Sequence, residues 1–332
     1  MNVSRLPSRR ISTAAVAASA ALGLLTLSAC DAGGSSAKTA DGKLNVIASF
    51  YPMEFLAKEI GGDHVSVTGL TKPGTEPHDL ELTAKQTGSL AGAGAIVYLK
   101  GVQPAVDKAI EQSGNKNVAD AASLTELEKH GTEVEGHDHG KDEHGHGEDD
   151  GHNHSSNESG SDPHIWLDPV KYAEVAKGVG KTLAKADPDH RADFEKNTDA
   201  LVKKLDGLNK KFTDGLKNRA SDTFITTHAA FGYLAERYGL DQESIKGLDP
   251  ESEPSAARRK DLEKIAKDHG VSTVFFETIA NPATAKTLAS DLGLKTDVLD
   301  PLEGITGKSK GRDYFEVMES NLAALQKALG TK

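Results

Sequence analysis

The sequence is short of cysteine, since its 332 residues contain only Cys30. A lone cysteine excludes an intrachain disulfide framework, and it excludes a metal site built from several thiolates. Aromatic residues make up only 5% of the chain, with a single tryptophan. Two catalytic signatures are also missing: there is no GxxxxGK[ST] nucleotide-binding loop and no His-Glu-x-x-His zinc-protease run. These absences argue against a P-loop nucleotidase and against a zinc protease of that type.

The N-terminus has the pattern of an export signal. Three arginines among the first ten residues precede an apolar, small-residue stretch, and Leu-Ser-Ala-Cys at 27–30 has the form of a lipobox. Residues 1–29 are therefore predicted to be a lipoprotein signal peptide, and Cys30 the lipid anchor on the extracytoplasmic face of the cell membrane. An uncleaved membrane helix is the alternative, but the stretch is rich in Ala, Ser and Thr and leads into a flexible tether at 30–43.

Acidic residues outnumber basic ones, which gives a formal net charge of −11. Removal of residues 1–29, which contain three arginines and no acid, makes the charge −14. A chain with this negative charge is not expected to bind nucleic acid or an anionic membrane surface, and it mildly attracts cations. The roughly 300 residues that remain are enough for two domains.

Histidine is concentrated in one short segment that also carries many acids. Six of the 13 histidines lie there: His137, His139, His144, His146, His152 and His154. Because the segment has several glycines and almost no apolar side chains, we predict a disordered insert at about 130–161. A flexible chain loses entropy on each capture, so the insert is expected to bind metal weakly and exchange it fast. The alternative is a solubilising low-complexity insert.

Strand and helix patterns alternate along the rest of the chain, which predicts an α/β fold with doubly wound parallel sheets in two lobes. The first lobe, 44–168, has strands at 44–49, 64–70 and 95–99, with helices at 54–60 and 83–91. Connecting helices follow over 169–218; the second, at 189–218, would be about 45 Å long. The second lobe, 219–332, has strands at 223–227, 244–245, 272–277 and 295–299, with helices at 231–238, 255–269, 282–292 and 314–329. A ligand is expected in the cleft between the lobes.

Three of the seven histidines outside the insert lie where ligand sites collect in such sheets, at strand ends or in loops. His78 is in a turn after the strand at 64–70, His164 is in a loop, and His228 ends the strand at 223–227. Each alone is compatible with a structural role, but together the three positions favour one site between the lobes. The other candidates lie at polar helix ends or loop edges and are expected to be solvated: His130, His190 and His269.

Five motifs resemble the zinc-binding lipoproteins of bacterial ABC importers, the ZnuA-like branch of a cluster that also contains TroA-like manganese binders. The motifs are PHDLELT at 77–83, DPHIWLDP at 162–169, THAAFGY at 227–233, ESEPS at 251–255 and LDPLEG at 299–304. The resemblance extends from residue 46 to the end of the chain. A histidine-rich insert ahead of the second motif is typical of the zinc members.

The resemblance implies a metal held by His78, His164 and His228, with a carboxylate or water in the fourth position. In some relatives the acid directly before the first histidine is the fourth ligand, but here a proline stands in that place. Other relatives use the glutamate of a Pro-Leu-Glu run, which matches Glu303. Manganese members place an aspartate near Asp300. Glu303 is therefore the predicted ligand and Asp300 the second choice, with a turn-forming role as its alternative.

Three imidazoles and one carboxylate make a nitrogen-rich site that suits tetrahedral Zn²⁺, whereas Mn²⁺ is better served by oxygen ligands. By resemblance, manganese members carry a carboxylate at the third position, where this chain has His228. Copper and nickel would bind the same nitrogens, so selectivity would depend on geometry and supply. Three nearby acids are candidates to orient the imidazoles: Asp79, Asp168 and Glu277.

The function implied is that of a high-affinity zinc-binding component of an ABC importer, not an enzyme. It would capture Zn²⁺ and deliver it to a membrane permease driven by a separate ATPase, with its own membrane contact through lipid on Cys30. One alternative is a manganese-binding or adhesin-type member of the same family. Another is a surface zinc hydrolase, because catalytic zinc keeps an open fourth position.

Overall fold

The computed structural model describes residues 1, 37–130, 161–252 and 254–331. The predicted signal peptide, Cys30 and the six histidines of the insert lie outside these residues. The chain separates into the units Met1–Gly34 and Ser35–Lys332, and the second contains all of the described helices and strands. Within the described ranges, no helix has both the length and the apolar character needed to cross a membrane.

The first lobe is built on a parallel sheet with the strand order β2-β1-β3-β4. Its strands are β1 (Leu44–Ala48), β2 (Val65–Gly69), β3 (Ala95–Tyr98) and β4 (Val118–Asp120), and its helices are α1 (Tyr51–Gly61), α2 (Ala84–Gly92) and α3 (Pro104–Ser113). Alternate residues of β1 face opposite sides of the sheet. Val46 and Ala48 belong to the main core with α1, whereas Ile47 packs in a second core with residues of α2 and α3. The sheet is therefore buried on both faces, as predicted.

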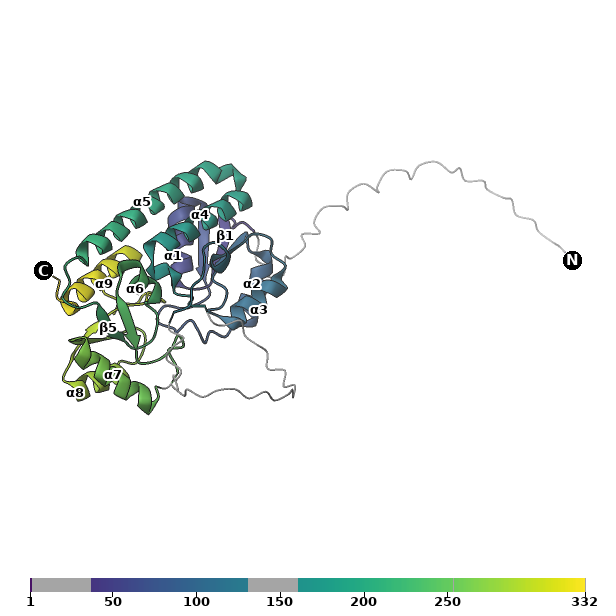
Figure 1. The fold of residues 1–332 in the computed structure, drawn as a ribbon. Coiled ribbons are helices and arrows are strands. Elements are labelled where there is room, and N and C mark those ends of the chain that lie inside the picture. Colours follow the sequence, from purple (N-terminus) through teal and green to yellow (C-terminus); the bar gives the residue numbers. More distant parts are fainter. Residues whose placement is uncertain (2–36, 131–160, 253, 332) are drawn as a thin grey trace, which may run out of the picture. The chain divides into compact units, whose positions relative to one another are not determined.

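Two long helices follow the first lobe, α4 (Pro169–Ala186) and α5 (Arg191–Gly215). The 25 residues of α5 correspond to about 37 Å. This helix is shorter than the predicted 189–218, because 3₁₀ turn η5 (Pro188–His190) precedes it. In Figure 1, α5 runs along one edge of the second unit. It packs against α1 of the first lobe, against α4, and against α9 (Tyr314–Ala328) near the other end. The long helix therefore contacts both lobes.

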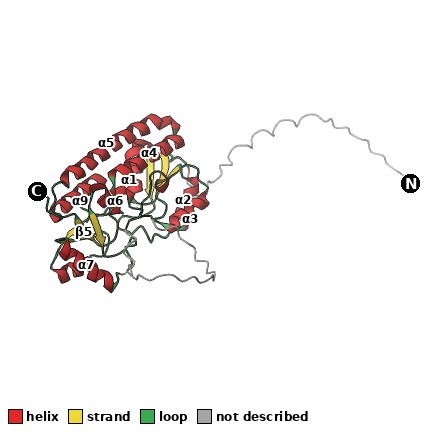
Figure 2. Ribbon diagram, viewed as in Figure 1, coloured by secondary structure: helices red, strands yellow, loops and turns green. Residues whose placement is uncertain are grey.

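The second lobe repeats the architecture with the strand order β6-β5-β7-β8, again all parallel. Figure 2 shows its helices around this sheet. Its strands are β5 (Thr223–Thr226), β6 (Asp241–Ser244), β7 (Thr273–Phe276) and β8 (Lys295–Val298), and its other helices are α6 (Gly232–Tyr238), α7 (Ala256–Asp268) and α8 (Ala283–Leu292). The two-lobed α/β fold is confirmed. The sequence patterns missed α3 and β4.

Candidate metal site

The four predicted ligand side chains converge on one point between the lobes. Glu303 Oε1 lies 3.3 Å from His78 Nε2, 3.2 Å from His164 Nε2 and 3.4 Å from His228 Nε2. The last two imidazoles and the glutamate are fully buried, whereas the His78 side chain is 17% exposed. Ligand atoms about 2.1 Å from a tetrahedral zinc lie about 3.4 Å from one another. The three separations from Glu303 Oε1 match that spacing, and Glu303 belongs to two possible ligand groups, one with His78 and His164 and one with His228 and Glu277.

Three of the four side chains follow the carboxyl ends of parallel strands. His78 lies in the loop after β2, His228 directly after β5, and Glu303 in the loop after β8. The fourth, His164, immediately precedes the 3₁₀ turn η4 (Ile165–Leu167). Carboxyl ends of parallel strands are where ligands collect in α/β sheets, because loops from neighbouring strands meet there. Here the two sheets direct such loops to a shared site.

Buried hydrogen bonds tie together the loops that carry these ligands. Trp166 Nε1 donates to Pro301 O at 2.7 Å, which joins the His164 turn to the Glu303 loop. Tyr314 in α9 donates from its hydroxyl to Trp166 O at 2.6 Å. Gln103 Nε2 donates to Pro77 O at 3.0 Å, next to His78. The ligand positions are therefore fixed by buried contacts.

Two buried acids orient two of the imidazoles. Asp162 Oδ1 accepts a hydrogen bond from His164 Nδ1 at 2.7 Å and another from the His164 backbone N–H at 2.9 Å. Glu277 Oε1 accepts from His228 Nδ1 at 2.6 Å. When Nδ1 carries the proton, Nε2 is left with a lone pair for a metal. Both rings therefore present Nε2 to the cluster around Glu303.

The expectation for Glu277 is thus confirmed, whereas that for Asp168 is wrong. Asp168 accepts hydrogen bonds from Arg237 at 2.7 and 2.9 Å, and it caps α4 through Val170 N at 2.8 Å. Asp79 makes no hydrogen bond to an imidazole among the described residues. Asp162, which orients His164, was not predicted. Its signal was an aspartate two residues before a histidine, because Asx turns form over that spacing.

The charges of the cluster stabilise one another. Burial alone would lower the pKa of His164, but the charge and hydrogen bonds of Asp162 and Glu303 raise it above the ordinary 6.5. The pKa of His228 is raised further, because Glu277 and Glu303 again outweigh burial. Burial would raise the pKa of Glu303, but the hydrogen bonds from His164 and His78 and the charge of His228 hold it well below its usual value. Glu303 and the two buried imidazoles thus favour one another's charged forms.

Two buried atoms of the cluster, His228 Nε2 and Glu303 Oε2, have no hydrogen-bond partner. A buried polar atom without a partner costs about 1–3 kcal/mol. A metal ion bound to these atoms would remove that cost, which supports the fit of a cation to the donor set.

A further acid, Glu76, was also missed by the sequence analysis. Burial and the charge of Glu303 raise the pKa of Glu76 to about 8.

Asp300, the second choice as fourth ligand, has both oxygens engaged elsewhere. Its Oδ2 accepts from Thr278 Oγ1 at 2.7 Å, and its Oδ1 accepts from the backbone N–H of Leu302 at 2.9 Å. The contact with Leu302 closes a turn, which is the alternative role that the sequence analysis gave to Asp300. The geometry therefore brings Glu303 to the imidazoles and leaves Asp300 in the supporting turn.

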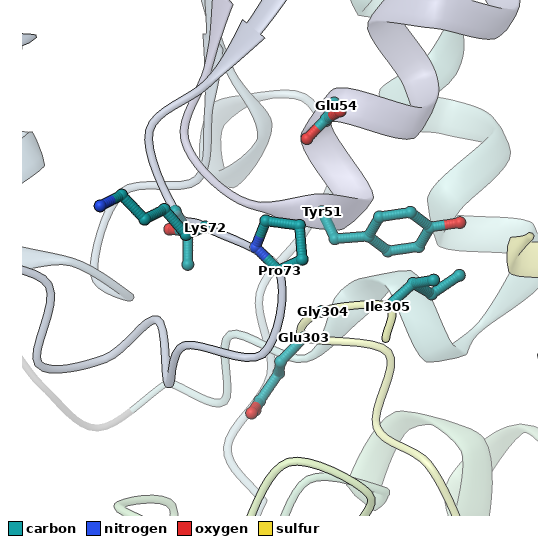
Figure 3. Close-up of a pocket in the computed structure, with 8 residues that line it drawn as sticks. Tyr51, Glu54, Lys72, Pro73, Glu303, Gly304 and Ile305 are labelled. Carbon is teal, nitrogen blue, oxygen red and sulfur yellow. The ribbon is translucent and has the colours of Figure 1, made fainter. Parts of the chain in front are cut away.

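A pocket borders the cluster on one side. Its lining comes from the first lobe and from the Glu303 loop of the second: Tyr51, Glu54, Thr71, Lys72, Pro73, Glu303, Gly304 and Ile305. In Figure 3 the carboxylate of Glu303 points away from the ring of Tyr51. Of the four predicted ligands, only Glu303 lines this pocket.

Several known proteins are similar to this chain. The family described as "Zinc-uptake complex component A periplasmic" matches residues 46–328. The zinc-binding lipoprotein AdcA of Streptococcus pneumoniae serotype 4 is 39% identical over 313 residues, which cover 92% of this chain and 59% of AdcA. The high-affinity zinc uptake system protein ZnuA of Bacillus subtilis is 38% identical over 325 residues, 93% of this chain and 98% of that protein.

A solved structure is also similar. The Zn(II)-bound ZnuA-like domain of S. pneumoniae AdcA superposes with a TM-score of 0.69 at 34% identity, and the match covers 87% of this chain and 99% of that domain. The chain thus corresponds to one zinc-bound domain of AdcA and spans 59% of the length of the whole relative.

Proposed function

The chain belongs to the zinc-uptake complex component A family, and from that membership we propose that it is the high-affinity zinc-binding component of an ABC importer. It captures Zn²⁺ outside the cytoplasm and delivers the ion to a membrane permease driven by a separate ATPase. The family is one of solute-binding proteins, and we assign no catalysis to this chain. The observation that carries the proposal is the approach of three imidazole nitrogens to one carboxylate oxygen, at 3.2–3.4 Å.

In the proposed site, zinc is bound by His78, His164, His228 and Glu303. The first two come from the first lobe, the others from the second lobe. Separation of the lobes would therefore divide the ligand set, which provides a route for release to the permease. Zinc suits three nitrogens and one oxygen in tetrahedral geometry, so we favour zinc over manganese.

The remaining parts of the chain are assigned on the same basis. Residues 1–29 act as the signal peptide, lipid on Cys30 anchors the chain at the extracytoplasmic face, and residues 30–43 form the tether. The lobes comprise 44–168 and 219–332, joined by the helices of 169–218. The six histidines between 136 and 154 serve as a weak accessory metal loop that feeds the site.

Competitive metal titration with elemental analysis tests this function. We expect the chain from Cys30 onward to bind Zn²⁺ in preference to Mn²⁺, and to retain its tightest zinc ion when residues 136–154 are deleted. The physical reason is that the buried ligands lie outside the deleted segment. Preference for manganese, or loss of the tight ion on deletion, would contradict the proposal.

The stability of the chain should depend on pH in opposite ways with and without zinc. Because the pKa values of His164 and His228 are raised, their protonated forms stabilise the metal-free fold below pH 6.5, and this stabilisation is lost as pH rises through the raised values. Zinc needs the neutral rings, so its affinity grows over the same range. We expect the Tm difference between zinc-loaded and metal-free protein to widen as pH rises above 6.5. Thermal melts of both forms would show this, and a constant difference would contradict it.

A further inference from the structure

A second group of ligand atoms lies on the surface beside α6. The groups are Glu128, His130 and Glu236, and one ligand atom from each lies within 4.8 Å of the other two. His130 Nε2 is 2.8 Å from Glu236 Oε2 and 3.9 Å from Glu128 Oε2. These distances bracket the separation of about 3.4 Å expected between ligands of one tetrahedral zinc. His130 had been expected to be solvated, but its side chain is only 18% exposed.

The His130 ring is oriented in the same way as the buried imidazoles. Its Nδ1 donates to Asp162 Oδ2 at 3.1 Å, and the Asp162 side chain is fully buried. The edge of Tyr233 packs on the ring, with centroids 4.6 Å apart. Gly232 makes this fit possible, because a Cβ there would lie 2.3 Å from the Cβ of His130. With Nδ1 fixed by a carboxylate, Nε2 is directed toward the two glutamates as a metal ligand would be.

Each glutamate keeps one carboxylate oxygen near His130 Nε2, where a metal ion would bind. Lys171 Nζ lies 2.6 Å from Glu128 Oε1, which leaves Oε2 on the side of His130. The Glu236 side chain is 60% exposed, so it can adjust and water can complete the coordination. One imidazole, two carboxylates and water are ligands that zinc accepts.

We propose that Glu128, His130 and Glu236 form a second, weaker site for Zn²⁺. The proposal goes beyond the transport function and does not depend on it. Weaker binding follows from the exposure of Glu236 and from the positive charge of Lys171 beside Glu128. The two sites share one carboxylate, because Asp162 accepts from His130 through Oδ2 and from His164 through Oδ1. The second site therefore lies one residue contact away from the cluster around Glu303.

The test uses the chain from Cys30 onward with the six insert histidines replaced by serine, so that the insert does not contribute. Zn²⁺ alone is the probe, in equilibrium dialysis with elemental analysis. We expect about two ions per chain, and about one after Glu236→Gln, since a neutral amide is a poor zinc ligand. Glu195→Gln is the matched control, because Glu195 is a glutamate with a 64% exposed side chain on α5. It should retain about two ions.

His130→Gln provides the second variant, and it should also lose the weaker ion. In each variant the tighter ion reports a folded chain and an intact first site. Binding of a single ion by the parent would overturn the proposal. It would equally be overturned if both Glu236→Gln and His130→Gln kept two ions. Retention of the tight ion after His228→Ala would instead contradict the ligand set around Glu303, so failures of the two sites are distinguishable.

Discussion

Replacement of His228 by alanine is expected to reduce zinc affinity by roughly 100- to 1,000-fold. Apparent binding free energies of four-ligand zinc sites are about 10–16 kcal/mol, so one ligand accounts for about 2.5–4 kcal/mol. His228 is fully buried, and its Nε2 has no other partner. Competition with a chelator of known affinity would measure the change. Because zinc stabilises the fold in proportion to the logarithm of its affinity, the zinc-induced rise in Tm should also shrink.

His269→Ala is the matched control, because His269 is exposed and its Nδ1 lies 3.2 Å from a threonine hydroxyl, Thr223 Oγ1. The control should bind zinc as the parent does. The His228 variant should also be less stable without metal, since Glu277 loses the imidazole that pairs with its charge. A folded His228→Ala variant with unchanged zinc affinity would show that His228 is not a ligand.

The sequence predicts the strands in the interior of each sheet best. β1 and β3 are buried runs of apolar residues, which the pattern of a parallel strand requires. Two of the four edge strands, β4 and β6, were harder to recognise. β4 has only three residues, and β6 has the polar sequence Asp-Gln-Glu-Ser, so neither carries an apolar run. Their pairing comes from the neighbouring strand and cannot be inferred from local composition.

The ligand candidates could be predicted because strand ends and motifs mark them, but their supporting acids could not all be found. Glu277, which follows β7, was one of three acids named as candidates to orient the imidazoles, and it contacts His228. Asp162 and Asp168 flank His164 in the same motif, and sequence alone does not show which one faces the ring. Arg237, from α6, settles the matter by pairing with Asp168. That pairing depends on the tertiary fold, which brings α6 beside the start of α4.

Replacement of Glu303 by glutamine is expected to weaken zinc binding by about 100-fold, because a neutral amide oxygen takes the place of a charged ligand. The substitution nearly preserves volume, so packing around this fully buried side chain should be kept. The metal-free protein should change as well. The raised pKa values of His164 and His228 depend in part on the charge of Glu303, so both should fall in the variant. Histidine titration by NMR would detect this shift.

Asp300→Asn separates the two acids proposed as fourth ligand. Asparagine can still accept from the backbone N–H of Leu302 through its side-chain oxygen, so the turn should survive. Since neither oxygen of Asp300 is directed at the imidazoles in the present geometry, zinc affinity should stay close to that of the parent. A large loss in Asp300→Asn together with little loss in Glu303→Gln would reverse the assignment. A loss of zinc affinity confined to Glu303→Gln would instead show that Glu303 is the charged ligand beside the three imidazoles. Its loop, which follows β8, is held in place by the hydrogen bond from Trp166 to Pro301.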